Sequence, residues 1–233
     1  MKSRMDILAV LSRADQLYRS RATEGAVKES VALLAGVVGG ADRYEVQWRL
    51  ARSLFFLGQE ADSAGGKRQL HAAGIGAGER AAAISPERVE GHFWLGVNLA
   101  LFAECAAGIK AVRALLRGRN ELRLAKEISE SYHGAGPLRV LGRITHKAPR
   151  LLGGSPKRSR RLFDRALQIA PLNSVTLLYA AEQAIDVSDC DRARELLERV
   201  ISSDLDPDWE YENRRDRALA EALLKSLDNL VVG

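Results

Sequence analysis

Apolar residues recur along this chain at intervals of three and four positions, which is the period of an amphipathic α-helix. The spacing predicts three helices in the first third of the chain, over residues 7–18, 23–38 and 48–57. The second is expected to end at Gly39-Gly40 and the third at Gly58. No run of alternating apolar and polar residues lies between hairpin turns. The pattern therefore predicts an all-α protein.

Small residues recur at positions where two helices would cross. The spacing small-x3-large-x2-Ala-x4-Pro occurs once clearly and once in a weaker form: Ser159, Phe163, Ala166 and Pro171, then Gly74, Gly78, Ala81 and Pro86. The Leu-Gly pair expected in the first helix of a repeat occurs at 95–96 and at 141–142. A fifth repeat follows the same spacing of small and large residues, with Ala181, Ala193, Leu197 and Val200. Tetratricopeptide repeats pack helix pairs through such small residues. We therefore predict an irregular tetratricopeptide-like array of about five helical hairpins.

The array is expected to form a single domain over residues 1–233. Within it, residues 1–89 match the repeat pattern loosely, residues 90–205 match it best, and residues 206–233 form a linker and a capping helix. Glycine-rich connections are predicted inside two helical pairs, at residues 58–66 and 148–156. The last helix, residues 211–230, would cover the apolar surface that the final repeat cannot bury alone.

The charge is distributed unevenly along the chain. Residues 104–165 hold 15 Lys or Arg and 5 Asp or Glu, a net of +10 in a chain whose total is +5, so the rest sums to −5. Five of these cations form a basic patch on one short helix: Lys157, Arg158, Arg160, Arg161 and Arg165. A solvated helix face, an anionic lipid surface, an acidic partner or the acidic end of a second protomer would each explain the patch. Nucleic-acid binding is not expected, because no interleaved aromatic residues accompany the cations.

From Glu90 onward the sequence resembles a known family. The resemblance is carried by EGHFWLGVNL at 90–99, GPLRVLGR at 136–143, APRLLGGS at 148–155, SRRLF at 159–163 and ALQIAPLN at 166–173. This run is similar to the T component associated with TRAP transporters (the TatT family), whose members are tetratricopeptide-like and are encoded beside bacterial solute transporters. The Pro-x3-Gly-Gly connection is its most specific part. A more distant likeness exists to eukaryotic regulators of microtubule dynamics.

The resemblance implies a helical protein with an internal cleft or pore and no enzymatic activity. It also implies a homo-oligomer, expected to be a trimer, that docks the periplasmic substrate-binding component of a transporter and accommodates a hydrophobic small molecule. The residues themselves favour no enzyme and no cofactor. The glycines of residues 74–78 lack the strand and the Lys-Ser/Thr of a phosphate loop, and the four histidines lack the spacing of a zinc site.

Six residues are candidates for ligand or partner binding. His92, Trp94 and Asn98 belong to a helix that is apolar on nearly all sides, where polar groups need partners; they would face the cleft or bond to neighbouring backbone. Arg139, Arg143 and His146 share one face of the helix after Pro137 and would grip a carboxylate or form a solvated basic face. Arg143 is the strongest single candidate.

Two functional hypotheses follow. The first is a non-catalytic accessory protein that binds a partner protein, and an apolar or carboxylate ligand, in an internal cleft. The alternative is a cytosolic interaction scaffold whose basic middle segment engages an acidic partner or an anionic membrane surface. The sequence alone, with neither signal peptide nor lipobox nor transmembrane segment, predicts a cytoplasmic location, whereas the family resemblance implies the periplasm once a leader is removed.

Cys105 and Cys190 are expected to be buried free thiols, with a single disulfide as the alternative.

Overall fold

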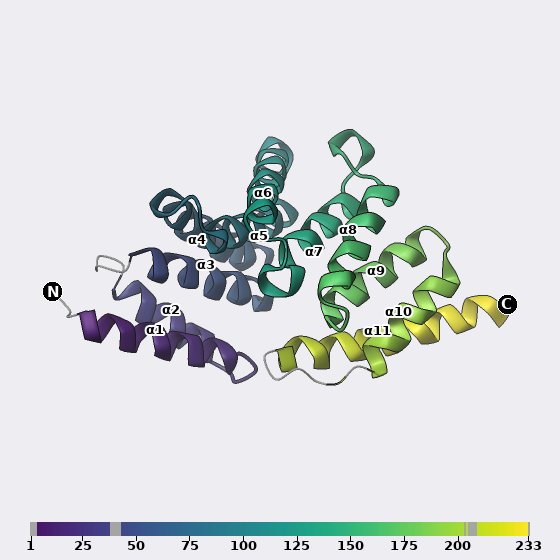
Figure 1. Ribbon diagram of the computed structural model, residues 1–233, viewed down its shortest axis with the longest axis horizontal. Coiled ribbons are helices and arrows are strands. Elements are labelled where there is room, and N and C mark those ends of the chain that lie inside the picture. The colour runs from purple at the N-terminus through teal and green to yellow at the C-terminus, as the bar shows by residue number, and fades with distance from the viewer. Residues whose placement is uncertain (1–3, 38–42, 203, 205–208, 233) are drawn as a thin grey trace. The chain divides into compact units, whose positions relative to one another are not determined.

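The protein is built from helices. The computed structural model describes residues 4–37, 43–202, 204 and 209–232, and these contain eleven α-helices, one 3-10 turn and no strand (Figure 1). The helices are α1 (Arg4–Arg19), α2 (Ala26–Ala35), α3 (Arg43–Glu60), α4 (Ala64–Ile84), α5 (Val89–Cys105), α6 (Gly108–Ile128), α7 (Tyr132–Lys147), α8 (Pro156–Ile169), α9 (Ser174–Asp186), α10 (Cys190–Ser202) and α11 (Glu210–Val232), with the 3-10 turn η1 (Arg150–Leu152) before α8. The all-α prediction is confirmed.

Consecutive helices pack in antiparallel pairs, each joined by a short connection (Figure 1). In the described part of the chain the pairs are α1 with α2, α3 with α4, α5 with α6, α7 with α8, and α9 with α10. The last helix, α11, lies against both α9 and α10, and its Ala220 and Leu227 are buried in their apolar core. The predicted helical-hairpin array and its C-terminal capping helix are therefore confirmed.

Contacts between residues divide the chain into two compact units, Met1–Ser129 and Glu130–Gly233. The first unit holds helices α1 to α6 and the second holds α7 to α11. The division falls inside the segment 90–205, which the repeat pattern treated as one block. The single domain over residues 1–233 stays a prediction.

In the first unit, glycines let helix backbones touch. A Cβ on Gly78 of α4 would come within 2.8 Å of the Cα of Leu95 in α5, a distance that no side chain tolerates. Between α5 and α6, a Cβ on Gly96 would lie 2.6 Å from the Leu122 side chain, and one on Gly118 would lie 3.0 Å from the Gly96 carbonyl oxygen. The small residues at 78 and 96 therefore act as predicted, by allowing close helix crossings.

The second unit follows the clearest sequence repeat. Ser159, Phe163 and Ala166 are all fully buried on one face of α8, and Pro171 follows the end of that helix. Gly142 of α7 lies under the Phe163 ring, where an added Cβ would come within 2.6 Å of its Cε1. The same spacing of small and large residues thus builds the α7–α8 contact, as the repeat pattern predicted.

The prediction that a helix stops at Gly58 is wrong. Helix α3 continues to Glu60, and α4 begins at Ala64 with the Ser63 side chain accepting a hydrogen bond from the Gly66 amide. The connection is therefore much shorter than the predicted 58–66. Gly58 has a packing role instead, since a Cβ there would come within 2.4 Å of the His71 ring. The helix predicted over residues 23–38 is also shorter than expected, since α2 begins at Ala26, ends at Ala35 and has Gly36 as its C-cap. Gly39 and Gly40, the predicted stop, lie outside the described residues.

Two other local predictions are settled by the structure. The connection at 148–156 is confirmed: it holds η1, and Pro156 opens α8 at a position where a missing N–H costs nothing. The cysteines are both free, as expected, but Cys190 is exposed and Cys105 is only partly covered, so the prediction of buried thiols is wrong. Each cysteine belongs to a different unit.

Candidate functional site

Three of the predicted binding residues lie on α5, and all three are buried inside the first unit. His92 contacts the Glu121 carboxylate through Nδ1 at 2.7 Å and the Pro86 carbonyl oxygen through Nε2 at 2.8 Å. Both partners are hydrogen-bond acceptors, so the ring fills both contacts when it carries two N–H groups. Trp94 is 1% exposed and packs between the rings of Phe55 and Phe93.

Asn98 is fully buried and bonds to three different helices of the first unit. Its Nδ2 donates to the carbonyl oxygens of Ala51 in α3 and Trp94 in α5, at 3.0 and 2.8 Å. Its Oδ1 accepts from Nδ1 of His71 in α4 at 3.2 Å. The structure thus gives His92, Trp94 and Asn98 roles in holding α3 to α6 together, and their binding roles stay predictions.

The other three candidates lie on α7, and all of them point toward α9 or the residue that caps it. Arg139 is buried and donates from Nη1 to the Gly134 carbonyl oxygen at 2.8 Å and to Oδ1 of Asn173 at 3.3 Å. Its guanidinium also lies over the Trp209 ring, 5.4 Å from the ring centre. Burial lowers the pKa of Arg139 to about 10, so the side chain still carries its charge at neutral pH.

The carbonyl groups that Arg139 holds belong to an unusual turn. His133, Gly134 and Ala135 all have positive φ angles, of 53°, 61° and 59°, so regular helix begins only around Pro137, where the sequence placed it. Left-handed backbone is costly for residues with a side chain and persists only when surrounding contacts maintain it. Arg139 supplies such contacts, which makes its observed role the support of this turn.

Arg143 and His146 pair with acidic residues of α9. Arg143 forms an ion pair with Glu182, and its guanidinium lies 4.4 Å from the centre of the Tyr179 ring. Nε2 of His146 lies 2.8 Å from Oδ2 of Asp186, while its Nδ1 is buried without a hydrogen-bond partner among the described residues. Burial, followed by the neighbouring Lys147 charge, lowers the pKa of His146. Arg143 keeps 29% of its side chain exposed, and its binding role stays a prediction.

The basic patch lies on the exposed face of α8, opposite the buried Phe163. Three of its cations have partners: Arg160 pairs with Asp189 at 2.8 Å, Arg165 pairs with Glu130, and Arg158 donates to the Gly153 carbonyl oxygen at 2.7 Å. Lys157 and Arg161 have no partner in the part of the chain that the structure describes. The patch is therefore only partly neutralised.

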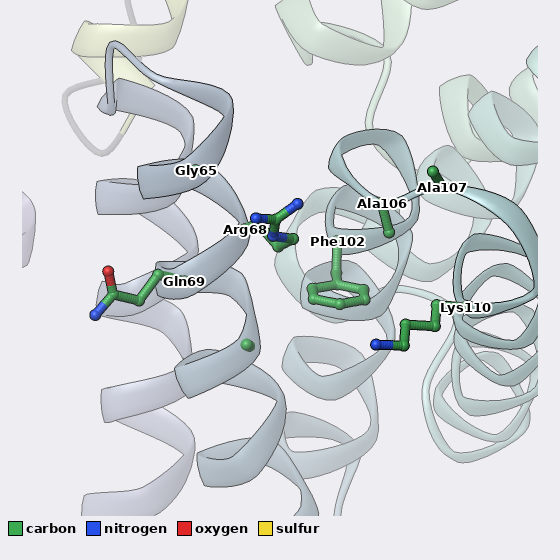
Figure 2. A pocket seen from close by; sticks show the side chains of 8 residues that line it. Gly65, Arg68, Gln69, Phe102, Ala106, Ala107 and Lys110 are labelled. Carbon is green, nitrogen blue, oxygen red and sulfur yellow. The ribbon is translucent and has the colours of Figure 1, made fainter.

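A depression of about 680 Å³ opens on the first unit at a place that the sequence did not indicate (Figure 2). It is bounded by α4, the end of α5 and the start of α6, through Gly65, Arg68, Gln69, Ala72, Phe102, Ala106, Ala107 and Lys110. Figure 2 shows the Phe102 ring between the Arg68 and Lys110 side chains, with Gln69 turned away from them. Arg68 and Lys110 have no ion-pair partner within the described residues.

Sequence reasoning missed this depression because its lining residues come from three helices and have no common spacing. Phe102 was visible only as one residue of an apolar helix, and Lys110 only as one cation of the basic middle segment. Phe102 packs against the cluster of Leu95, Leu99 and Ala114, which holds the ring in place.

The described residues contain no group of three or more His, Cys, Asp or Glu that could hold a metal ion, and no described helix is long and apolar enough to span a bilayer.

Comparisons with known proteins agree with this architecture. A crystal structure of a thermophilic TPR protein from Thermus thermophilus superposes with a TM-score of 0.70 over 92% of this chain and 98% of that chain, at 16% sequence identity, which establishes the likeness of fold. No curated protein matches the sequence. The family described as TRAP transporter T-component matches residues 51–231, so the match begins well before Glu90, where the resemblance was first evident. The chain belongs to the TRAP transporter T-component family.

Proposed function

We propose that this protein is a non-catalytic accessory component that docks a partner protein and holds an apolar, carboxylate-bearing ligand. The family suggests a role beside a TRAP transporter, and both the family and the tetratricopeptide fold are non-catalytic kinds. The single observation that supports ligand binding is the depression on the first unit, where the Phe102 ring lies between two cations (Figure 2).

The chemistry of the depression suits an amphipathic anion. Phe102 offers an apolar surface that is only partly covered, and burial of that surface by a hydrocarbon chain is favourable. The Arg68 guanidinium and the Lys110 ammonium group lack ion-pair partners among the described residues, so a carboxylate would gain charge-assisted hydrogen bonds without displacing an internal acid. The buried Arg139 and the partly exposed Arg143, by contrast, already have partners.

The ligand half of the proposal is tested with decanoate and decanol, measured by isothermal titration calorimetry. We expect saturable binding of decanoate, weakened about tenfold by Arg68→Gln or Lys110→Gln, with little change for decanol. Arg113→Gln is the matched control, because it removes a cation of α6 that lies outside the depression. Absence of decanoate binding, or equal effects of all three variants, would reject the ligand half.

The partner half concerns the substrate-binding component of a TRAP transporter, which is the partner that the family resemblance implies. The purified component from the same organism is mixed with the full chain and examined by sedimentation velocity. We expect a complex that sediments faster than either protein, and two independent boundaries would reject this partner. The same experiment on the chain alone tests the expected trimer, since a monomer sediments more slowly than a closed homo-oligomer.

A further inference from the structure

The connection between α7 and α8 carries the most exposed large apolar side chain of the described residues. Leu151 is 99% exposed, whereas the next most exposed, Ile109 and Leu172, reach 62%. A lone exposed leucine is ordinary on a protein surface and by itself indicates nothing. Leu151 differs from the others in two respects: the rigidity of the loop that carries it and the charge that surrounds it.

The loop is held in one conformation by its own hydrogen bonds. The Pro149 carbonyl oxygen accepts from the Leu152 and Gly154 amides at 2.9 and 3.0 Å, and the Gly153 amide donates to the Arg150 carbonyl oxygen at 2.9 Å. The Ser155 amide returns to the Thr145 carbonyl oxygen at the end of α7, at 3.0 Å. These bonds fix both ends of the loop and leave the Leu151 side chain projecting from its tip.

The two glycines make this conformation possible. Gly153 has a φ of 83°, in the region that side chains disfavour, and its carbonyl oxygen accepts from Nη2 of Arg158 at 2.7 Å. A Cβ on Gly154 would lie only 1.8 Å from the Ala148 carbonyl oxygen, so the loop closes in this way only with glycine there. The Pro-x3-Gly-Gly sequence therefore builds a fixed support for an apolar side chain that is almost completely exposed.

The segment of chain that carries Leu151 is strongly positive. Residues 147–163 contain six Lys or Arg and no Asp or Glu. Lys147 pairs with Asp186 and Arg160 with Asp189, at 2.9 and 2.8 Å. Four charges in this segment have no ion-pair partner among the described residues: Arg150, Lys157, Arg158 and Arg161. The fixed leucine thus belongs to a segment that holds four cations without ion-pair partners among the described residues.

We propose that the loop 148–155 is a protein-docking element: Leu151 enters an apolar pocket of an acidic partner protein, and the four cations face carboxylates around that pocket. The inference rests on the proposed function, since it assigns the partner-binding role to a surface. A protein partner fits better than a membrane, because a fixed loop reduces the entropy lost in forming a shape-specific interface. A fluid bilayer gains nothing from that fixed shape, and one leucine contributes little to membrane insertion.

The proposal is tested by placing the photo-reactive residue p-benzoylphenylalanine at position 151 of the full chain in living cells of the source organism. The matched control carries the same residue at 172, which is also exposed, lies in the same unit and belongs to the short connection before α9. We expect a discrete protein adduct at 151 and none at 172. No adduct at 151, equal adducts at both positions, or cross-linking to lipid would each overturn the proposal.

The adduct protein is then identified by mass spectrometry, purified, and its affinity for the full chain measured. We expect Leu151→Ser to weaken binding about tenfold or more, Leu172→Ser to leave it within about twofold, and the double substitution Arg150→Gln with Lys157→Gln to reduce its salt dependence. Unchanged affinity for Leu151→Ser would overturn the docking role. An adduct with a protein other than the TRAP substrate-binding component would support the loop and reject the partner named under the proposed function.

Vesicles separate the membrane from the protein partner. The full chain is mixed with vesicles of phosphatidylcholine alone and with vesicles that also contain phosphatidylglycerol, and flotation is compared for wild type and Leu151→Ser. We expect no binding that depends on Leu151. Flotation with the anionic vesicles that Leu151→Ser abolishes would overturn the proposal in favour of a lipid surface.

Discussion

Asn98 of α5 occupies the space that a side chain at position 74 of α4 would need. A Cβ on Gly74 would come within 2.3 Å of Oδ1 of Asn98, while the same amide bonds to backbone carbonyl oxygens in α3 and α5. A glycine in the middle of a helix is normally unfavourable. Here Gly74 leaves room for the buried Asn98 amide, which joins three helices of the first unit.

We expect Gly74→Ala to destabilise the first unit by about 1–3 kcal/mol, since the new methyl group would displace a buried, fully bonded amide. Gly76→Ala is the matched control: it lies on the same helix, and a Cβ there meets only the end of the Arg80 side chain at 3.5 Å. That variant should be neutral or more stable by about 0.5–1 kcal/mol, because alanine favours helix. Urea denaturation measures both changes, and equal effects of the two variants would contradict this account.

His71 links the stability of the first unit to pH. Its ring is 1% exposed and donates from Nδ1 to Asn98, and burial lowers its pKa below the ordinary 6.5. The unfolded chain therefore binds a proton at His71 at a higher pH than the folded chain does, so stability falls as the pH decreases below 6.5. Above that value both states are neutral, and His71 adds no pH dependence.

The measurement is the free energy of unfolding from about pH 7.5 to about pH 5.5, together with an NMR titration of the His71 ring. His71→Gln should be less stable throughout but should show a shallower loss toward acid pH than the wild-type chain. A His71 ring that titrates at or above its ordinary pKa would contradict the prediction.

Arg139 should matter more for folding than for binding. Arg139→Ala removes the guanidinium that donates to the Gly134 carbonyl oxygen, at a cost of about 1–3 kcal/mol. Oδ1 of Asn173 also loses this donor but keeps its hydrogen bonds from the Thr176 amide and hydroxyl. The left-handed turn at 133–135 and the contact with Trp209 should loosen with it. We expect a lower melting temperature and a changed near-ultraviolet circular dichroism signal, with Lys147→Ala, an exposed cation on the same helix, as control. A stability equal to that of the control would show that the turn does not depend on Arg139.

Arg143 allows binding to be separated from packing. Arg143→Ala should weaken binding of the transporter component by about 1–3 kcal/mol if the guanidinium holds a desolvated charge pair across the interface. Glu182→Gln breaks the same internal ion pair but leaves the cation in place. The two variants should therefore lose a similar, small amount of stability, because the pair is partly exposed, while only Arg143→Ala loses affinity. Unchanged affinity would remove Arg143 from the binding surface.

Much of the fold could be read from local spacing. The helices around Phe163, Gly142 and Gly78 were predictable because helical period and the need for a small residue at a crossing are both visible within a few turns of chain. Gly58 shows where this reasoning fails: glycine as a helix end and glycine as a packing gap look identical in sequence. Only the position of His71, on the next helix, distinguishes them.

The candidate site was less predictable. Arg139, Arg143 and His146 do share one face of α7, but that face meets Glu182 and Asp186 of α9 and its capping residue Asn173. Both arginines and Nε2 of His146 therefore already have partners. The depression lies elsewhere, between Arg68 and Lys110, which are far apart in the chain and have no common pattern. Leu151 belonged to a quoted motif, yet its complete exposure could not be inferred from the motif.

The amino-acid sequence by itself determined the helices, their pairing, the close crossings and the family, because these depend on periodic or adjacent residues. The tertiary structure alone decided which charges are used internally and which remain for a ligand or partner. The physical reason is that a charge is satisfied by whatever lies within hydrogen-bonding distance, and in this protein those groups come from other helices. Arg139 and Arg68 are both cations on helices, and their surroundings decide which of them is used internally.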